Sequence, residues 1–117
     1  MNAPMVKVKR SKFHNVRIEV DGIKFDSKKE YKRYTELKLL ERAGIIQDLR
    51  LQVPFELVPA QPGGLRSERP LTYVADFVYY DKENDRQVIE DTKGVKTDLY
   101  IVKRKLMKLA GHEIVEV

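Results

Sequence analysis

The chain has 117 residues, of which 42% are hydrophobic and 35% are charged, and its formal net charge is +5. This length and apolar fraction suit one domain with a single core. The chain has no cysteine and only two histidines, which excludes a disulfide framework and a cysteine nucleophile and argues against a zinc site. No apolar run approaches the roughly 18 residues of a membrane span, and no apolar segment follows the basic start as it would in a secretory signal. We therefore expect a cytoplasmic protein with no membrane partner and no small-molecule cofactor.

The excess positive charge lies at the start of the chain. Residues 1–17 contain basic but no acidic side chains, whereas the two kinds are equal in number over the remaining residues. The basic residues of this segment are Lys7, Lys9, Arg10, Lys12 and Arg17. We predict that residues 1–12 form a flexible basic arm that binds nucleic-acid phosphates, ahead of a single domain over residues 13–117. The alternative is a solubilising segment.

Residues 15–25 alternate between apolar and polar side chains on either side of Asp21-Gly22. Asp-Gly between two apolar runs is typical of a tight turn. The segment therefore predicts an N-terminal β-hairpin, whose edges are candidates for pairing with another chain.

The pattern Ser27-Lys28-Lys29-Glu30 is a capping box, in which a serine and a glutamate three residues later satisfy free N–H groups at the start of a helix. Apolar residues then recur every three or four positions as far as Gly44, a residue type that commonly ends helices. These features predict a helix over residues 27–43.

Three strands are predicted in the middle of the chain. Residues 46–58 are rich in leucine, valine and phenylalanine, and Pro54 confines this strand to a sheet edge, a bulge or two short pieces. Residues 59–70 hold three prolines and two glycines and predict a loop, either an insertion or a hairpin tip. The other two strands are predicted at 71–80 and 87–92, on either side of a polar turn.

The last part of the chain predicts a second helix, which starts at Asp98 and ends at Gly111, and a short strand at 114–117. The predicted buried stripe of this helix is Leu99, Val102, Leu106 and Leu109. Together the elements predict an α+β fold with a mixed central sheet flanked by helices. Its core has the order helix, three strands, helix, strand (αβββαβ) and follows the N-terminal hairpin.

An acidic residue interrupts the apolar strand at 71–80. Strand alternation places Asp76 on the same face as Val74 and Val78, where it should be half-buried. Burial of an ionised carboxylate is costly unless a cation or hydrogen bonds compensate for it. Asp76 is therefore a candidate functional residue.

A second acidic residue lies on the next predicted strand. Asp91 and Lys93 are two positions apart and share the face of Ile89. Antiparallel pairing of the two strands would set Asp76 beside Asp91, with Lys93 one step further. Two such carboxylates suit Mg²⁺ or Mn²⁺, and the ammonium group could act on water or on phosphate charge. This set suits phosphodiester hydrolysis.

Asp76 followed by Asp91-Thr92-Lys93 on the next strand resembles the motif of the PD-(D/E)xK nuclease superfamily, although Ala75 stands where that motif has proline. Over roughly residues 13–117 the chain resembles a family of small phage-associated proteins of this superfamily. The matching segments are Phe25–Tyr31, Gln52–Phe55, Tyr73–Phe77 and Asp91–Gly94. The resemblance implies a restriction-endonuclease-like fold.

The resemblance also implies roles for individual residues. Asp76 and Asp91 would hold the metal ion, with the backbone carbonyl of Thr92 as a third ligand. Lys93 would activate water or stabilise the transition state. Glu30 on the first helix would complete the catalytic set, but it is also the capping-box glutamate, and one carboxylate cannot fill both roles completely.

Two further residues flank this set. Gln52 matches a strand glutamine that lies near the active site in some relatives, and the alternative is an ordinary exposed strand residue. Glu90 precedes Asp91 and should face the opposite side of the sheet. We expect Glu90 to form a structural ion pair unless a kink brings it to the site.

We predict a metal-dependent endodeoxyribonuclease that cuts DNA with structural or weak sequence preference, in phage or prophage DNA processing or recombination in a bacterial host. Basic residues around the second helix would follow the DNA backbone, or would form a solvated face: Lys96, Lys103, Arg104 and Lys105. The alternatives are a non-catalytic DNA-binding module and an assembly subunit that uses the hairpin at 15–25. Because cutting both strands needs two active sites or two visits, we also expect a homodimer.

Overall fold

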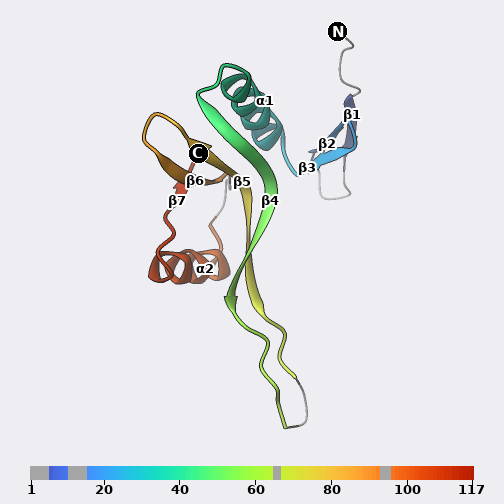
Figure 1. Ribbon diagram of the computed structural model, residues 1–117. Helices are drawn as coiled ribbons and strands as arrows, with labels where there is room; N and C mark the ends of the chain where they lie inside the picture. Colours follow the sequence, from blue (N-terminus) through green and yellow to red (C-terminus); the bar gives the residue numbers. More distant parts are fainter. Residues whose placement is uncertain (1–5, 11–15, 65–66, 93–95) are drawn as a thin grey trace.

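The computed structural model of the protein describes residues 6–10, 16–64, 67–92 and 96–117 (Figure 1). The elements are β1 (Val6–Arg10), β2 (Val16–Val20), β3 (Ile23–Phe25), α1 (Lys28–Arg42), β4 (Ile46–Val58), β5 (Leu71–Asp81), β6 (Arg86–Asp91), α2 (Asp98–Leu109) and β7 (Ile114–Glu116). No helix in these described ranges is long and apolar enough to cross a membrane.

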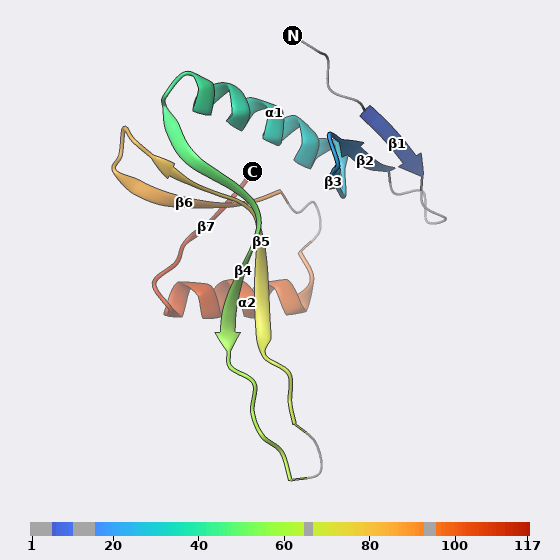
Figure 2. The same ribbon diagram turned by 45° about the vertical axis from the view of Figure 1, so that its right-hand side comes forward.

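The central sheet has the strand order β4-β5-β6-β7. The first three strands pair antiparallel, and β7 joins β6 in parallel. The two helices flank this open sheet, α1 near its upper part and α2 near its lower part in the view of Figure 2. The predicted α+β class and the mixed sheet between helices are confirmed.

The N-terminal segment forms a separate small sheet, with the order β1-β2-β3. The predicted hairpin is confirmed: Asp21 and Gly22, with φ of 50° and 81°, form its two-residue turn, as a type I′ turn requires. The expectation of an unstructured segment over residues 1–12 is wrong for Val6–Arg10, which pairs antiparallel with β2. The physical reason is that the open edge of the hairpin offers free N–H and C=O groups, which a third strand satisfies.

Helix α1 follows the predicted pattern closely. The Ser27 hydroxyl accepts a hydrogen bond from the Glu30 N–H at 3.1 Å, and Gly44 follows the helix with φ of 75°. The buried face of α1 packs on two clusters, because Leu37 lies against the central sheet whereas Tyr31 contacts Phe25 of the small sheet. The helix therefore joins the two sheets.

Strand β4 is the edge strand of the central sheet, which explains how it accommodates Pro54 in a single run. Strands β4 and β5 continue as a long hairpin, which extends well beyond both helices in Figures 1 and 2. An isolated bridge between Gln61 and Glu68 lies near its end. Residues 59–64 and 67–70 therefore belong to a hairpin tip, one of the two alternatives that the sequence left open.

Strand β5 changes sides of the sheet in its middle. Tyr73 and Ala75 are buried in the core cluster that α2 covers, whereas Phe77 and Tyr79 are buried in the cluster that α1 covers. In a regular strand these four residues would share one face. The sequence predicts that Val74 and Val78, two positions before and after Asp76, share its half-buried face, and this prediction is wrong. Val74 is 42% exposed and Val78 is fully buried.

Strand β4 changes sides at the same level. Leu51 packs on the α1 side and Val53 on the α2 side, and the residues between these two positions on the paired strands are Gln52 and Asp76. Gln52 has φ of 52°, in the left-handed region that glycine adopts more easily than other residues. The change of sides thus sets two polar residues opposite each other in the sheet.

The unusual backbone of Gln52 leads to a prediction about stability. The replacements Gln52→Ala and Gln52→Gly both remove the polar side chain. Alanine keeps the Cβ atom, which makes the left-handed conformation unfavourable, whereas glycine has none. We expect Gln52→Gly to be more stable than Gln52→Ala by about 1 kcal/mol, measured by urea unfolding. Equal stability of the two variants would show that this backbone conformation carries no strain.

Helix α2 docks on the sheet by a different face from the one that its leucine spacing predicts. Tyr100 and Met107 are its buried residues, whereas Leu99, Val102 and Leu109 are 57%, 49% and 84% exposed. The predicted stripe is therefore wrong for these three residues, whereas its fourth member, Leu106, is half-buried. Tyr100 takes the inward position because its ring packs near Tyr73, while its hydroxyl donates a hydrogen bond to Glu116 at 3.1 Å.

Candidate functional site

Glu30 lies in the first turn of α1 and is only 3% exposed. Its Oε2 accepts a hydrogen bond from the Asp26 N–H at 3.3 Å, which serves the start of the helix. Its Oε1 accepts a hydrogen bond from the Gln52 Nε2 at 2.9 Å. One oxygen of this carboxylate therefore contacts the backbone just before the helix, and the other contacts the edge strand β4.

Asp76 is held from two directions. Its Oδ2 accepts hydrogen bonds from the N–H and the Oγ1 of Thr92, at 2.8 and 2.9 Å. The Gln52 Nε2 makes a longer contact of 3.5 Å with its Oδ1. Gln52 thus connects the carboxylates of Glu30 and Asp76, and the structure brings four of the predicted residues together at the point where the sheet changes sides.

Asp91 is fully buried and turns toward the cluster that α2 covers. Its Oδ2 accepts a hydrogen bond from the Tyr73 hydroxyl at 2.6 Å, and burial together with this bond raises the pKa of Tyr73. The antiparallel β5–β6 ladder has the expected register, since its last pair, Phe77 with Glu90, sets Asp76 and Asp91 at the next position. The hydrogen bonds that Asp76 accepts on this side come from Thr92, the residue after Asp91.

Burial, and next the charge of Asp76, raise the pKa of Glu30 from 4.5 to about 7. The physical reason is that the ionised form would place a second negative charge beside Asp76 in a site that water hardly reaches. At neutral pH this carboxyl is therefore close to its titration midpoint. A cation bound between the two carboxylates would relieve both penalties.

The raised pKa predicts a pH dependence of stability in the metal-free protein. A carboxyl with a higher pKa in the folded chain binds a proton on folding, so its favourable contribution is complete below pH 4.5 and is lost as the pH rises through about 7. We therefore expect the wild type to lose stability over this window relative to Glu30→Gln, which has no proton to lose. Urea unfolding in EDTA measures this difference, and a difference that stays constant with pH would contradict the assignment.

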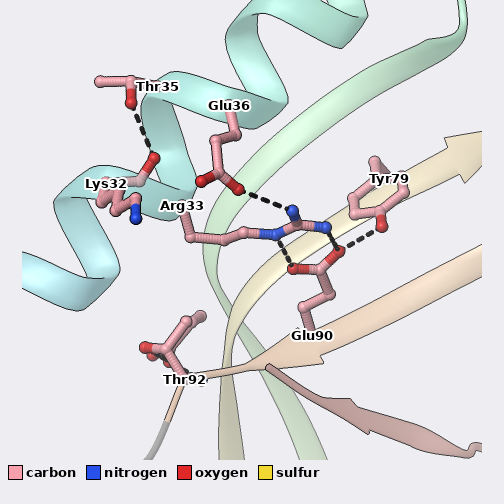
Figure 3. Close-up of polar contacts among 8 residues, drawn as sticks. Lys32, Arg33, Thr35, Glu36, Tyr79, Glu90 and Thr92 are labelled. Atoms are coloured by element: carbon pink, nitrogen blue, oxygen red, sulfur yellow. Dashed lines mark hydrogen bonds and ion pairs between the residues drawn. The ribbon is translucent and has the colours of Figure 1, made fainter.

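Glu90 forms the structural ion pair that the sequence predicts. It is 1% exposed, and Arg33 of α1 donates to its two oxygens from Nε and Nη2 at 2.7 and 2.8 Å (Figure 3). The Tyr79 hydroxyl also donates to Glu90, and the remaining Arg33 nitrogen bonds Glu36 at 2.9 Å. The sequence analysis missed Arg33. The sequence of a helix does not show which of its polar residues will contact a strand, and Glu90 is 57 positions away.

The predicted DNA-binding residues divide into three groups. Lys96 and Arg104 both form ion pairs with Glu116, at 2.6 and 3.2 Å, and these contacts hold the pKa of Glu116 down at about 2, with Lys96 the larger cause. Lys103 and Lys105 lie on α2 without an ion pair among the described residues. The remaining candidates are Lys7, Lys9 and Arg10 on β1, and Lys12, which lies outside the described residues. The predicted catalytic residue Lys93 also lies outside the described residues.

The donor set at Glu30 and Asp76 suits a hard divalent cation. Within the described ranges no group of three or more histidine, aspartate or glutamate side chains could hold a metal ion by itself. Mg²⁺ does not need such a cage, because it commonly binds one or two carboxylates, several waters and the phosphates of its substrate. Two carboxylates joined by an amide side chain, one of them with a raised pKa, fit that requirement.

Comparison with known proteins identifies one family. Residues 10–116 match a family described as "Protein of unknown function (DUF1064)". The chain has no significant match among curated proteins and none among solved structures.

Proposed function

We propose that this chain, which belongs to the DUF1064 family, is a metal-dependent endodeoxyribonuclease with a restriction-endonuclease-like fold. The observation that carries the proposal is the convergence of Glu30 from α1 and Asp76 from β5 on the side chain of Gln52. These residues come from three different elements. The resemblance to the PD-(D/E)xK nucleases, which rests on the sequence motif, points to the same positions.

In this proposal Glu30 and Asp76 hold Mg²⁺ or Mn²⁺, together with the backbone carbonyl of Thr92. The ion, when bound, polarises the scissile phosphate and lowers the pKa of bound water. Thr92 keeps the Asp76 carboxylate in place through its two hydrogen bonds. Gln52 positions both carboxylates from the edge strand, so neither must reorganise when the substrate arrives.

Two residues of the sequence motif have supporting roles in the proposal. Lys93 activates water or offsets the charge that develops on the phosphate, as its place in the motif suggests. Asp91, the second acidic residue of the motif, would be a further ligand of the metal ion, and the hydrogen bond from Tyr73 holds one of its oxygens. The substrate is DNA, cut with structural or weak sequence preference in phage or prophage DNA processing.

The test is a cleavage assay on supercoiled plasmid, linear duplex, single strands, a flap and a four-way junction. Each substrate is incubated with Mg²⁺, with Mn²⁺ and with EDTA. We expect cutting that requires the metal ion and differs between the substrates. Absence of cutting by folded protein on every substrate and with either metal would refute the proposed activity.

A non-catalytic DNA-binding module on the same fold is the second candidate, because one observation favours it. Within the described residues no group of three or more histidine, cysteine, aspartate or glutamate side chains could hold a metal ion, which is fewer carboxylates than the motif implies. In that case Asp91→Ala would change neither cutting nor binding of DNA. In the enzyme we expect Asp91→Ala to remove cutting while binding is largely kept.

A further inference from the structure

A hollow of about 210 Å³ lies between α1 and the end of β6, outside the carboxylate site. Four of its lining residues come from one side of α1, and Thr92 closes it from the sheet. The α1 residues are Lys29, Lys32, Arg33 and Glu36, and Val117 completes the lining. Figure 3 shows Arg33 and Glu36 on this side of α1, with Thr92 at the end of the strand. The helical wall of the hollow therefore carries three basic residues and one acidic residue, and Thr92 and Val117 line the opposite side.

The lysines of this wall are available for a ligand. Arg33 is fully engaged by Glu90 and Glu36, so the acidic residues near the hollow already have a partner. Lys29 and Lys32 are exposed, and neither forms an ion pair within the described part of the chain. Their spacing of three positions places them on one helix face. Two ammonium groups at one opening favour an anion there.

Thr92 connects the hollow to the carboxylate site. It lines the hollow and also donates two hydrogen bonds to the Oδ2 of Asp76. Thr92 therefore lies between the hollow and the carboxylate site. A DNA strand carries a phosphate at every nucleotide, so a strand that passes Asp76 presents further phosphates to the surface beside it.

We infer that the hollow lined by Lys29, Lys32 and Thr92 binds a backbone phosphate of the DNA strand, next to the phosphate held at Asp76. This inference rests on the proposed function, because it takes DNA as the substrate. Lysine is a common phosphate-binding residue that acts as a point charge. The contact positions the strand and carries no information about base sequence.

The experiment measures binding of a fluorescein-labelled linear duplex to the double variant Lys29→Gln/Lys32→Gln. It is carried out in EDTA at several salt concentrations, so that no cutting occurs. We expect about a tenfold loss of affinity at low salt. The slope of log affinity against log salt concentration should be smaller in magnitude by about 1 for each lysine that contacts phosphate. The loss should be similar for duplexes of different sequence.

The matched control is Lys82→Gln/Arg86→Gln, which removes the same charge from two exposed residues, one in the turn after β5 and one at the start of β6. Both variants should unfold at the wild-type urea concentration. Equal effects of the two variants would show that net charge alone is measured, and would overturn the inference. Unchanged affinity and slope in the lysine variant, or no DNA binding by the wild type, would overturn it as well.

The outcome separates this inference from the proposed activity. If the wild type never cuts DNA but the lysine variant binds DNA more weakly and with a smaller salt dependence, the hollow binds DNA phosphate and only the nuclease proposal fails. If the wild type cuts and the lysine variant binds and cuts normally, the nuclease proposal stands and the inference fails. When both hold, KM for DNA should rise in the lysine variant with little change in kcat, because the contact lies outside the reacting bond.

Discussion

Replacement of Asp76 by asparagine is expected to lower metal-dependent DNA cleavage on the order of a thousandfold or more. The amide can still accept the hydrogen bonds from Thr92, so the local structure should survive. It cannot supply the negative charge that holds a divalent cation. A bound ion contributes several kcal/mol of transition-state stabilisation, and about 1.4 kcal/mol corresponds to a factor of ten in rate.

The measurement is the initial rate of plasmid nicking in Mg²⁺, with DNA binding measured in parallel in EDTA. Asp85→Asn is a matched control, since Asp85 is an exposed carboxylate in the turn between β5 and β6. Its φ of 52° also suits asparagine. We expect Asp85→Asn to cut at the wild-type rate and Asp76→Asn to bind DNA without cutting it. Wild-type cutting by Asp76→Asn would place the chemistry elsewhere in the molecule.

Replacement of Arg33 by methionine is expected to cost about 3–5 kcal/mol of folding free energy, because it leaves the Glu90 carboxylate buried without its partner. Glu90 is 1% exposed, so water cannot take the place of the guanidinium. Small domains have a total stability of about 5–15 kcal/mol, so the variant should be close to unfolding. Urea unfolding, or the yield of folded protein where unfolding is already complete, measures the loss.

A second variant and a control distinguish this effect from loss of surface charge. Adding Glu90→Gln to Arg33→Met removes the unpaired charge, so the double variant should recover part of the lost stability. Lys38→Met breaks an exposed pair with Glu41 on the same helix, at 3.1 Å, and should cost no more than about 0.5 kcal/mol. Equal losses for Arg33→Met and Lys38→Met would contradict a structural role for the buried pair.

Several elements were predictable because their signals are local. The turn at Asp21-Gly22, the start of α1 at Ser27 and the stop at Gly44 each depend on residues within one or two turns of chain. The edge position of β4 was one of three alternatives that Pro54 left open, because proline cannot donate a hydrogen bond to a neighbouring strand. The sequence motif also named three candidate site residues, which are Glu30, Gln52 and Asp76. It did not predict that their side chains contact one another.

The errors have a common physical cause. Strand alternation and helical spacing assume regular elements, whereas β4 and β5 change sides of the sheet and α2 turns Tyr100 inward. Which face an element buries depends on the surfaces that it meets, and these come from distant parts of the chain. The same reason explains why the contact of Asp76 with Thr92 was not predicted.

The sequence by itself determined the order of the elements after the basic start, the hairpin turn, the caps of α1 and the set of polar residues that could carry chemistry. These depend on short-range backbone preferences and on residue type. Only the tertiary structure decided that Gln52 joins Glu30 to Asp76, that Asp91 turns to Tyr73, and that Arg33 reaches Glu90. Those contacts depend on where the sheet changes sides and on how α1 and α2 pack against it, which follows from burial of the whole core.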